Sequence, residues 1–192
     1  GIGYNYYTGD KISLTDEKKD SVNKCNISTW KDFTNVEEYN LYKAQGMEIY
    51  NDFVFIFKDG GGGIVLDYST KAIISSFDTE PTANNHQNCA NFTNLFYSDG
   101  DEFPLILISR CIGGSYDECL VYRITRSNTD FTFTLINSIR FNSTSYGITW
   151  GIDLNKKKLV FTGLFNGNWQ VTANNPIYVA KFELPSFSDI IS

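Results

Sequence analysis

Short apolar runs separated by turn-type residues fill the chain from about residue 44 onward. Each run has the length of a β-strand and is rich in Val, Ile, Phe and Tyr, which favour pleated sheets. The first four runs are GMEIYN, FVFIFK, GIVLDYS and KAIISSFD. Because only a few residues separate one run from the next, we predict a four-stranded antiparallel meander.

The same succession of runs returns twice. The second unit reads HQNCANFTNLFY, FPLILISR, ECLVYRI and FTFTLINSIRF, and the third reads YGITWGIDLN, KKLVFTGL and NPIYVAKFEL, without a fourth run. The units recur at roughly 45–60 residues, near the length of a four-stranded propeller blade. We therefore predict an all-β fold of about three meander sheets in an incomplete β-propeller, with a β-sandwich or barrel as the alternative.

Three segments carry a resemblance to bacterial β-propeller repeat proteins. Asp67 to Lys71 reads D-x-x-T after a strand, which resembles the hairpin between the third and fourth strands of their blades. The segments NNHQNCANF and YGITWGIDLNKKKLVFTG resemble the strands that open such blades. The resemblance covers about residues 44–184 and implies a scaffold only, because one fold hosts many functions.

Propellers have four to eight blades, more than this sequence encodes. Three arrangements follow: a piece of a longer protein, two copies that together supply six blades, or an open set of three sheets. We predict a polar N-terminal arm over residues 1–43 and a propeller-like domain over residues 44–192. In a homo-oligomer, the segment STWKDFTNVEEYNLYK of the arm would add an edge strand.

Charge and hydropathy limit the classes of partner that the sequence favours. The formal net charge is -6 and the basic residues are scattered, so no basic stripe is present and nucleic acid is not expected as a partner. No apolar run reaches the roughly 18 residues of a membrane-spanning helix. The chain starts with Gly1 rather than Met, which suggests a start produced either by processing, such as removal of a signal peptide, or by cloning. The expected location is secreted, periplasmic or cell-surface.

The single histidine of the sequence, His86, lies in a polar segment with Gln87 and Asn88. We predict this segment as the first strand of a blade, which would line the central channel. These three residues are therefore the leading ligand-binding candidates. Trp169, in the polar segment LFNGNWQVTANNP, is the fourth, as the tryptophan most expected to be exposed. We nominate no catalytic residue and no cofactor.

Acidic residues and cysteines give weaker signals. Asp99 and Asp101 in SDGDEF alternate as Ca²⁺ ligands do, but the other ligands of an EF-hand loop are missing and a solvated turn is favoured. Cys111 and Cys119 flank a Gly-Gly turn. A cross-strand disulfide is geometrically possible if the two lie opposite each other, with free thiols as the alternative.

The glycine run Gly60 to Gly63 is predicted as a hairpin turn. A phosphate-binding loop needs a helix after the glycines, and here a strand follows.

These features favour a non-catalytic module that binds a small molecule, glycan or protein on a propeller-like scaffold. One alternative is a propeller-type hydrolase, lactonase or lyase that uses His86 and nearby acids. The other is a structural or assembly protein that pairs through exposed edge strands.

Overall fold

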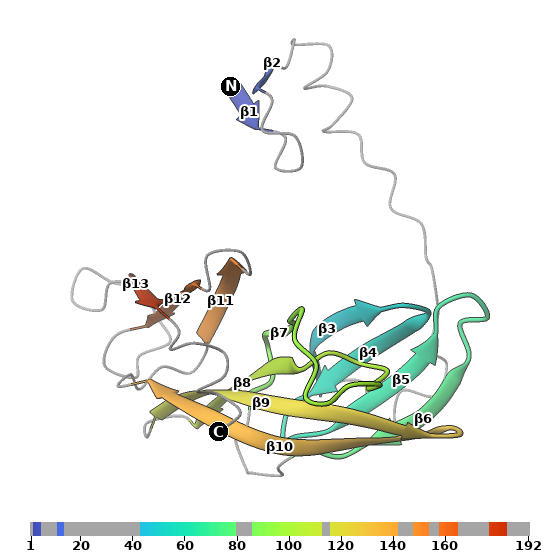
Figure 1. Ribbon diagram of the computed structural model, residues 1–192. Coiled ribbons are helices and arrows are strands. Elements are labelled where there is room, and N and C mark those ends of the chain that lie inside the picture. The colour runs from blue at the N-terminus through green and yellow to red at the C-terminus, as the bar shows by residue number, and fades with distance from the viewer. Residues whose placement is uncertain are drawn as a thin grey trace. The chain divides into compact units, whose positions relative to one another are not determined.

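A computed structural model of the protein shows β-strands connected by turns and loops (Figure 1). The structure describes residues 2–4, 11–13, 43–79, 86–112, 116–141, 148–153, 158–164 and 177–183. Among these residues there is no α-helix, and so none long and apolar enough to cross a membrane. The chain separates into two compact units, Gly1–Thr34 and Asn35–Ser192. The predicted boundary between arm and domain at residue 43 remains a prediction.

The N-terminal unit contains a small hairpin. Strand β1 (Ile2–Tyr4) pairs antiparallel with β2 (Lys11–Ser13), with Ile2 opposite Ser13. The sequence predicts only a polar arm here, because three-residue strands are too short to leave an alternating pattern.

The first four-stranded sheet is a meander in which each strand pairs antiparallel with the next. Its strands are β3 (Ala44–Tyr50), β4 (Phe53–Lys58), β5 (Gly63–Asp67) and β6 (Ile73–Phe77). They coincide with the four predicted runs. Alternate residues of β4, among them the fully buried Phe55 and Phe57, contribute to the main core, as the period of two requires.

The second sheet is again a meander of four consecutive strands. Its strands are β7 (Ala90–Phe92), β8 (Ile106–Ile112), β9 (Tyr116–Ser127) and β10 (Asp130–Phe141). Strand β7 is shorter than expected, because His86 to Cys89 precede it outside regular structure. A bulge between Leu135 and Asn137 interrupts the long β9–β10 ladder.

A third sheet holds β11 (Ile148–Asp153), β12 (Lys158–Leu164) and β13 (Ile177–Glu183) in the order of the sequence. The predicted all-β class and two four-stranded antiparallel sheets are thus confirmed. The described strands do not close into a ring, so the propeller itself remains an inference.

The first two sheets share one aromatic core. Phe55 of β4 packs edge-on against Phe92, Phe103 and Phe131 of the second sheet and its loop, and Phe77 stacks on Phe133 with ring centroids 4.1 Å apart. Such pairs contribute roughly 0.5–1.5 kcal/mol each beyond the burial of their area. These contacts fix the two sheets face to face.

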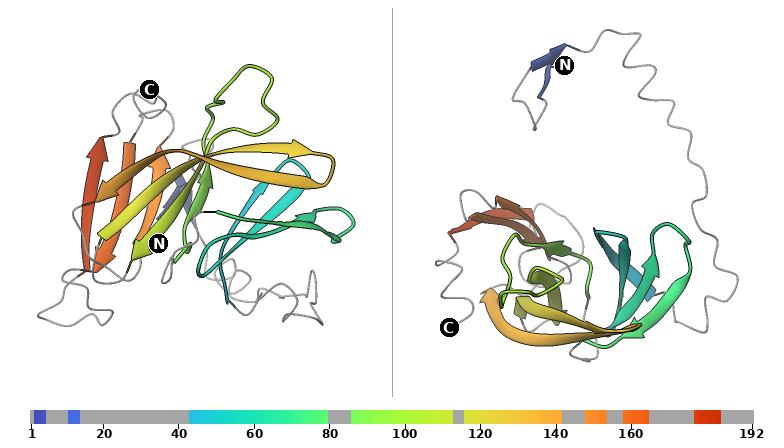
Figure 2. Two further views of the ribbon diagram at one scale, coloured as in Figure 1. Left: turned by 90° about the horizontal axis from the view of Figure 1, so that it is seen from below. Right: turned by 45° about the vertical axis from the view of Figure 1, so that its right-hand side comes forward.

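Strands β3 and β7, the first of each sheet, lie side by side and run in the same direction. Two contacts join them in order along both strands, Glu48 to Asn91 and Tyr50 to Phe92, and Gly46 lies against Gln87 in the segment just before β7. The last strands, β6 and β10, also contact each other. Equivalent strands of the two sheets are therefore adjacent. The two sheets can be followed by colour in Figure 2.

The glycine run forms the turn between β4 and β5. Gly60, Gly61 and Gly62 have positive φ of 84°, 99° and 73°, a conformation that side chains with a Cβ disfavour. The Lys58 amide donates to the Gly62 carbonyl over 3.0 Å, which closes the turn. The predicted hairpin is confirmed, with a longer positive-φ stretch than a two-residue turn needs.

The D-x-x-T segment forms the turn between β5 and β6. The Asp67 carboxylate accepts a 2.6 Å hydrogen bond from the Thr70 amide, and Lys71 has a φ of 61°. The bonds from Thr70 lower the pKa of Asp67. An aspartate that accepts from the backbone a few residues later is ordinary turn chemistry.

Candidate functional site

Gln87 ties the glycine turn to the segment that enters the second sheet. Its Nε2 donates to the carbonyl oxygens of Lys58 (2.7 Å) and Gly62 (3.0 Å), and its Oε1 accepts from the Thr79 hydroxyl (2.8 Å). The Thr79 hydroxyl also accepts from the Gly62 amide over 2.7 Å. Gln87 is 1% exposed, so it has a structural role and offers no polar group to a ligand.

Gly46 allows this entering segment to lie directly on β3. A Cβ at position 46 would overlap the carbonyl oxygen of Gln87. Only glycine permits such a close approach of two backbones. The approach brings His86 to the start of β3 and next to the glycine turn.

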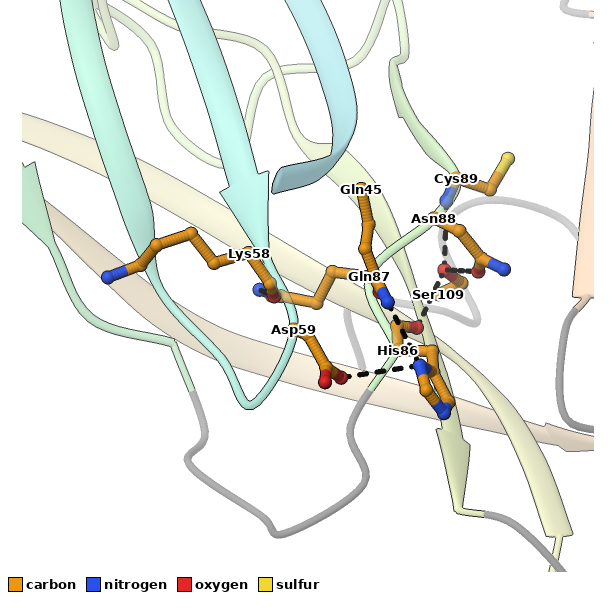
Figure 3. A network of polar contacts seen from close by, with 8 residues as sticks. All are labelled: Gln45, Lys58, Asp59, His86, Gln87, Asn88, Cys89 and Ser109. Carbon is orange, nitrogen blue, oxygen red and sulfur yellow. Dashed lines mark hydrogen bonds and ion pairs between the residues drawn. The ribbon is translucent and has the colours of Figure 1, made fainter. Parts of the chain in front are cut away.

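His86 lies between side chains from two different elements of the first sheet (Figure 3). Its Nδ1 is 3.0 Å from Nε2 of Gln45 on β3 and 3.2 Å from Oδ1 of Asp59 in the glycine turn. One nitrogen cannot serve both: with a proton it donates to Asp59, and without one it accepts from Gln45. Its Nε2 has no partner in the part of the chain that the structure describes.

Ser109 holds the backbone of the same segment from the β8 side. Its hydroxyl accepts from the Cys89 amide over 3.0 Å, and it lies within hydrogen-bond distance of the His86 carbonyl (3.2 Å) and Asn88 Oδ1 (3.1 Å). It bonds to the main chain of His86 and not to the ring. Ser109 is therefore not placed as a nucleophile activated by His86. Asn88, which lies within hydrogen-bond distance of the Ser109 hydroxyl, helps to orient the segment.

Glu48 on β3 is the second polar group between the first strands. Its Oε2 is 3.3 Å from Nδ2 of Asn91 on β7, and its Oε1 accepts from the Ile49 amide over 3.2 Å. Burial raises the pKa of Glu48 and outweighs the lowering effect of these two hydrogen bonds. Among the described residues no lysine, arginine or histidine forms an ion pair with this carboxylate.

We call these polar side chains along β3, β7 and the glycine turn the first-strand strip. It comprises Gln45, Glu48, Asp59, His86 and Asn91. All except Gln45 are partly buried. The strip carries two carboxylates, two amides and one imidazole, a set that can accept several hydrogen bonds and complement positive charge.

Three other carboxylates of the second sheet and its β7–β8 loop have basic partners. Asp101 pairs with Arg123 through contacts of 2.6 and 3.1 Å, and Glu102 pairs with Arg126 through contacts of 2.8 and 2.9 Å. Glu118, 1% exposed, receives Arg110 and Arg140 together. Glu48 forms no such ion pair with any residue that the structure describes.

The structure gives Asp101 a partner other than a metal ion. Its carboxylate is bound by Arg123, while Asp99 is exposed. In the described residues no three His, Cys, Asp or Glu side chains converge closely enough to hold a metal.

The cysteines do not lie as the disulfide hypothesis required. Cys119 is a buried free thiol opposite Ser109, and Cys111 is opposite Asp117, so the two cysteines are offset by two residues along the ladder. Burial raises the pKa of the Cys119 thiol, and the nearby Cys89 adds to that effect. A protonated, buried thiol is a poor nucleophile.

Sequence reasoning found part of the strip and missed the rest. The sequence predicts His86 as a site residue but does not predict the other four, because the alternation of side chains along a strand does not say which strands lie together. These four are Gln45, Glu48, Asp59 and Asn91. Trp169 is outside the described residues. Comparison with protein-family models and with curated protein sequences gives no match to this chain.

Proposed function

We propose that this protein is a non-catalytic binding module on a propeller-like scaffold, and that the first-strand strip takes a small cationic ligand. Support for the scaffold comes from consecutive meander sheets stacked with equivalent strands adjacent, β3 with β7 and β6 with β10. The first strand of the third sheet, β11, also contacts β8. Neighbouring blades of a propeller have this succession of four-stranded sheets.

The observation that carries the ligand class is Glu48. The Glu48 carboxylate is half-buried, and its partners among the described residues are the Asn91 side chain and the Ile49 amide. It has therefore lost hydration without gaining a counter-ion. A ligand ammonium group would supply that charge, and Asp59 offers a second carboxylate on the same strip. The net charge of -6 also attracts cations and repels anions.

A titration with a diamine tests this function. We expect putrescine, added to ¹⁵N-labelled protein, to shift amide signals of β3 and β7 saturably. Glu48→Gln removes the charge with little change of shape and should weaken binding about tenfold or more. The matched control Asp130→Asn, an exposed aspartate at the start of β10, should bind as wild type does. Absence of saturable shifts, or equal weakening by both variants, would contradict the proposal.

The Asp59–His86 pair favours a second candidate, a hydrolase, lactonase or lyase. A carboxylate 3.2 Å from Nδ1 orients the ring and leaves Nε2 available as a general base. Turnover of a model lactone that disappears in His86→Ala, while putrescine binding survives, would favour this enzyme over the binding module.

A further inference from the structure

The loop between β7 and β8 presents two exposed aromatic rings. Phe96 is 46% exposed and Tyr97 is 42% exposed. The loop follows the C-terminal end of β7, whereas the glycine turn lies beside the start of β3, where the Asp59 amide donates to the Lys43 carbonyl over 2.8 Å. Because β3 and β7 run in the same direction, the loop lies at the opposite end of the two sheets from the glycine turn.

Hydrogen bonds close the base of this loop. The Thr93 amide donates to the Leu105 carbonyl over 2.9 Å, and the Leu105 amide donates to the Leu95 carbonyl over 2.7 Å. Phe103 then enters the core at 1% exposure and packs against Tyr50 and Phe53 of the first sheet. The loop is therefore anchored to both sheets.

Two arginines of β9 hold the far part of the loop. Arg123 binds Asp101 and Arg126 binds Glu102, each through two nitrogens. Paired, bidentate contacts of this kind restrict orientation as well as distance. Ser98 and Asp101 are further joined across a turn by bonds of 3.2 Å in both directions.

Arg123 also fixes one of the exposed rings. Its guanidinium lies 4.9 Å from the centroid of the Tyr97 ring. Tyr97 is thus oriented by a cation that is itself bound to Asp101, yet much of its surface stays open to water. An exposed aromatic ring that is already held in place can contact a partner with little further loss of conformational freedom.

We infer that Phe96 and Tyr97 form a stacking platform for a neutral hexose chain. The negative face of an aromatic ring attracts the polarised C–H groups on the apolar face of a pyranose. The sugar hydroxyls would meet Ser98 and Asp99, both exposed on the adjoining turn. The arginines here are already neutralised by acids, and the chain is acidic overall, so a neutral glycan fits better than an anionic one. The platform is independent of the first-strand strip.

Calorimetric titration of the whole chain with cellohexaose tests this site. We expect saturable binding, weakened at least about tenfold in Phe96→Ala and in Phe96→Ala/Tyr97→Ala. Since Tyr97 also packs under Arg123, the single Phe96 variant separates loss of stacking from loss of loop order. Tyr68→Ala removes an equally exposed ring from the β5–β6 turn and should bind as wild type does.

The opposing results are equally specific. No heat of binding up to about 10 mM cellohexaose would overturn the inference, since even weak sites bind in that range. So would tighter binding of hexagalacturonate, an anionic chain, or equal weakening by Phe96→Ala and Tyr68→Ala. Glu48→Gln should leave cellohexaose binding unchanged, so failure of this site and failure of the diamine site are distinguishable.

Discussion

Replacing Gln87 by leucine is expected to lower the free energy of unfolding by about 3–5 kcal/mol. The substitution keeps an apolar stem of similar size but leaves the carbonyl of Lys58 and the hydroxyl of Thr79 without the bonds that Gln87 supplies. Each buried polar group without a partner costs about 1–3 kcal/mol. Urea unfolding followed by far-ultraviolet circular dichroism measures the loss.

Gln45→Leu is the control for Gln87→Leu. Gln45 is exposed on β3 and bonds only with His86 among the described residues, so its replacement should change stability by no more than about 0.5 kcal/mol. Equal losses in the two variants would show that the buried amide does not hold the glycine turn.

Replacing Glu118 by leucine is expected to destabilise the protein by about 3–5 kcal/mol. Glu118 is 1% exposed, and Arg110, its partner on β8, has a side chain only 13% exposed. Removing the carboxylate leaves the Arg110 guanidinium buried without a counter-charge. A buried charge without a partner strongly lowers the free energy of unfolding. Thermal and urea unfolding both report the change.

The double variant Glu118→Leu/Arg110→Leu separates charge from packing. It should regain part of the lost stability, because no unpaired charge then remains on β8. Glu102→Leu, which breaks the more exposed pair with Arg126, should cost at most about 1 kcal/mol. A double variant less stable than Glu118→Leu would contradict this interpretation.

The strands were predictable because their pattern is local. Runs such as FVFIFK and GIVLDY are short, continuous apolar stretches bounded by Gly, Asp and Asn, so their type and order follow from the sequence. The register between β8 and β9 could not be predicted from the sequence in the same way. Cys111 and Cys119 flank a turn, yet the ladder places Ser109 opposite Cys119, and no composition rule distinguishes the two registers.

The roles of polar residues depended on contacts distant in sequence. The sequence predicts Gln87 as a ligand-binding residue, but its side-chain amide donates to the Gly62 carbonyl of the glycine turn, 25 positions earlier. Glu48 could not be predicted as a site residue because its partner Asn91 is 43 positions away on another sheet. The sequence suggests Asp101 as a weak metal-ligand candidate, but in the structure its counter-ion is Arg123 of β9.

Among the residues that the structure describes, β3 and β7 bury a carboxylate without a basic partner, and a measurement of the pKa of Glu48 tests this arrangement. A raised folded pKa means that the contribution of this group to stability is fully present below its unfolded pKa and is lost as the pH rises through the folded pKa. A ¹³C-detected pH titration of the Glu48 side chain measures the folded value. We expect a midpoint above 4.5, whereas a midpoint at or below 4.5 would show that the carboxylate is solvated or paired.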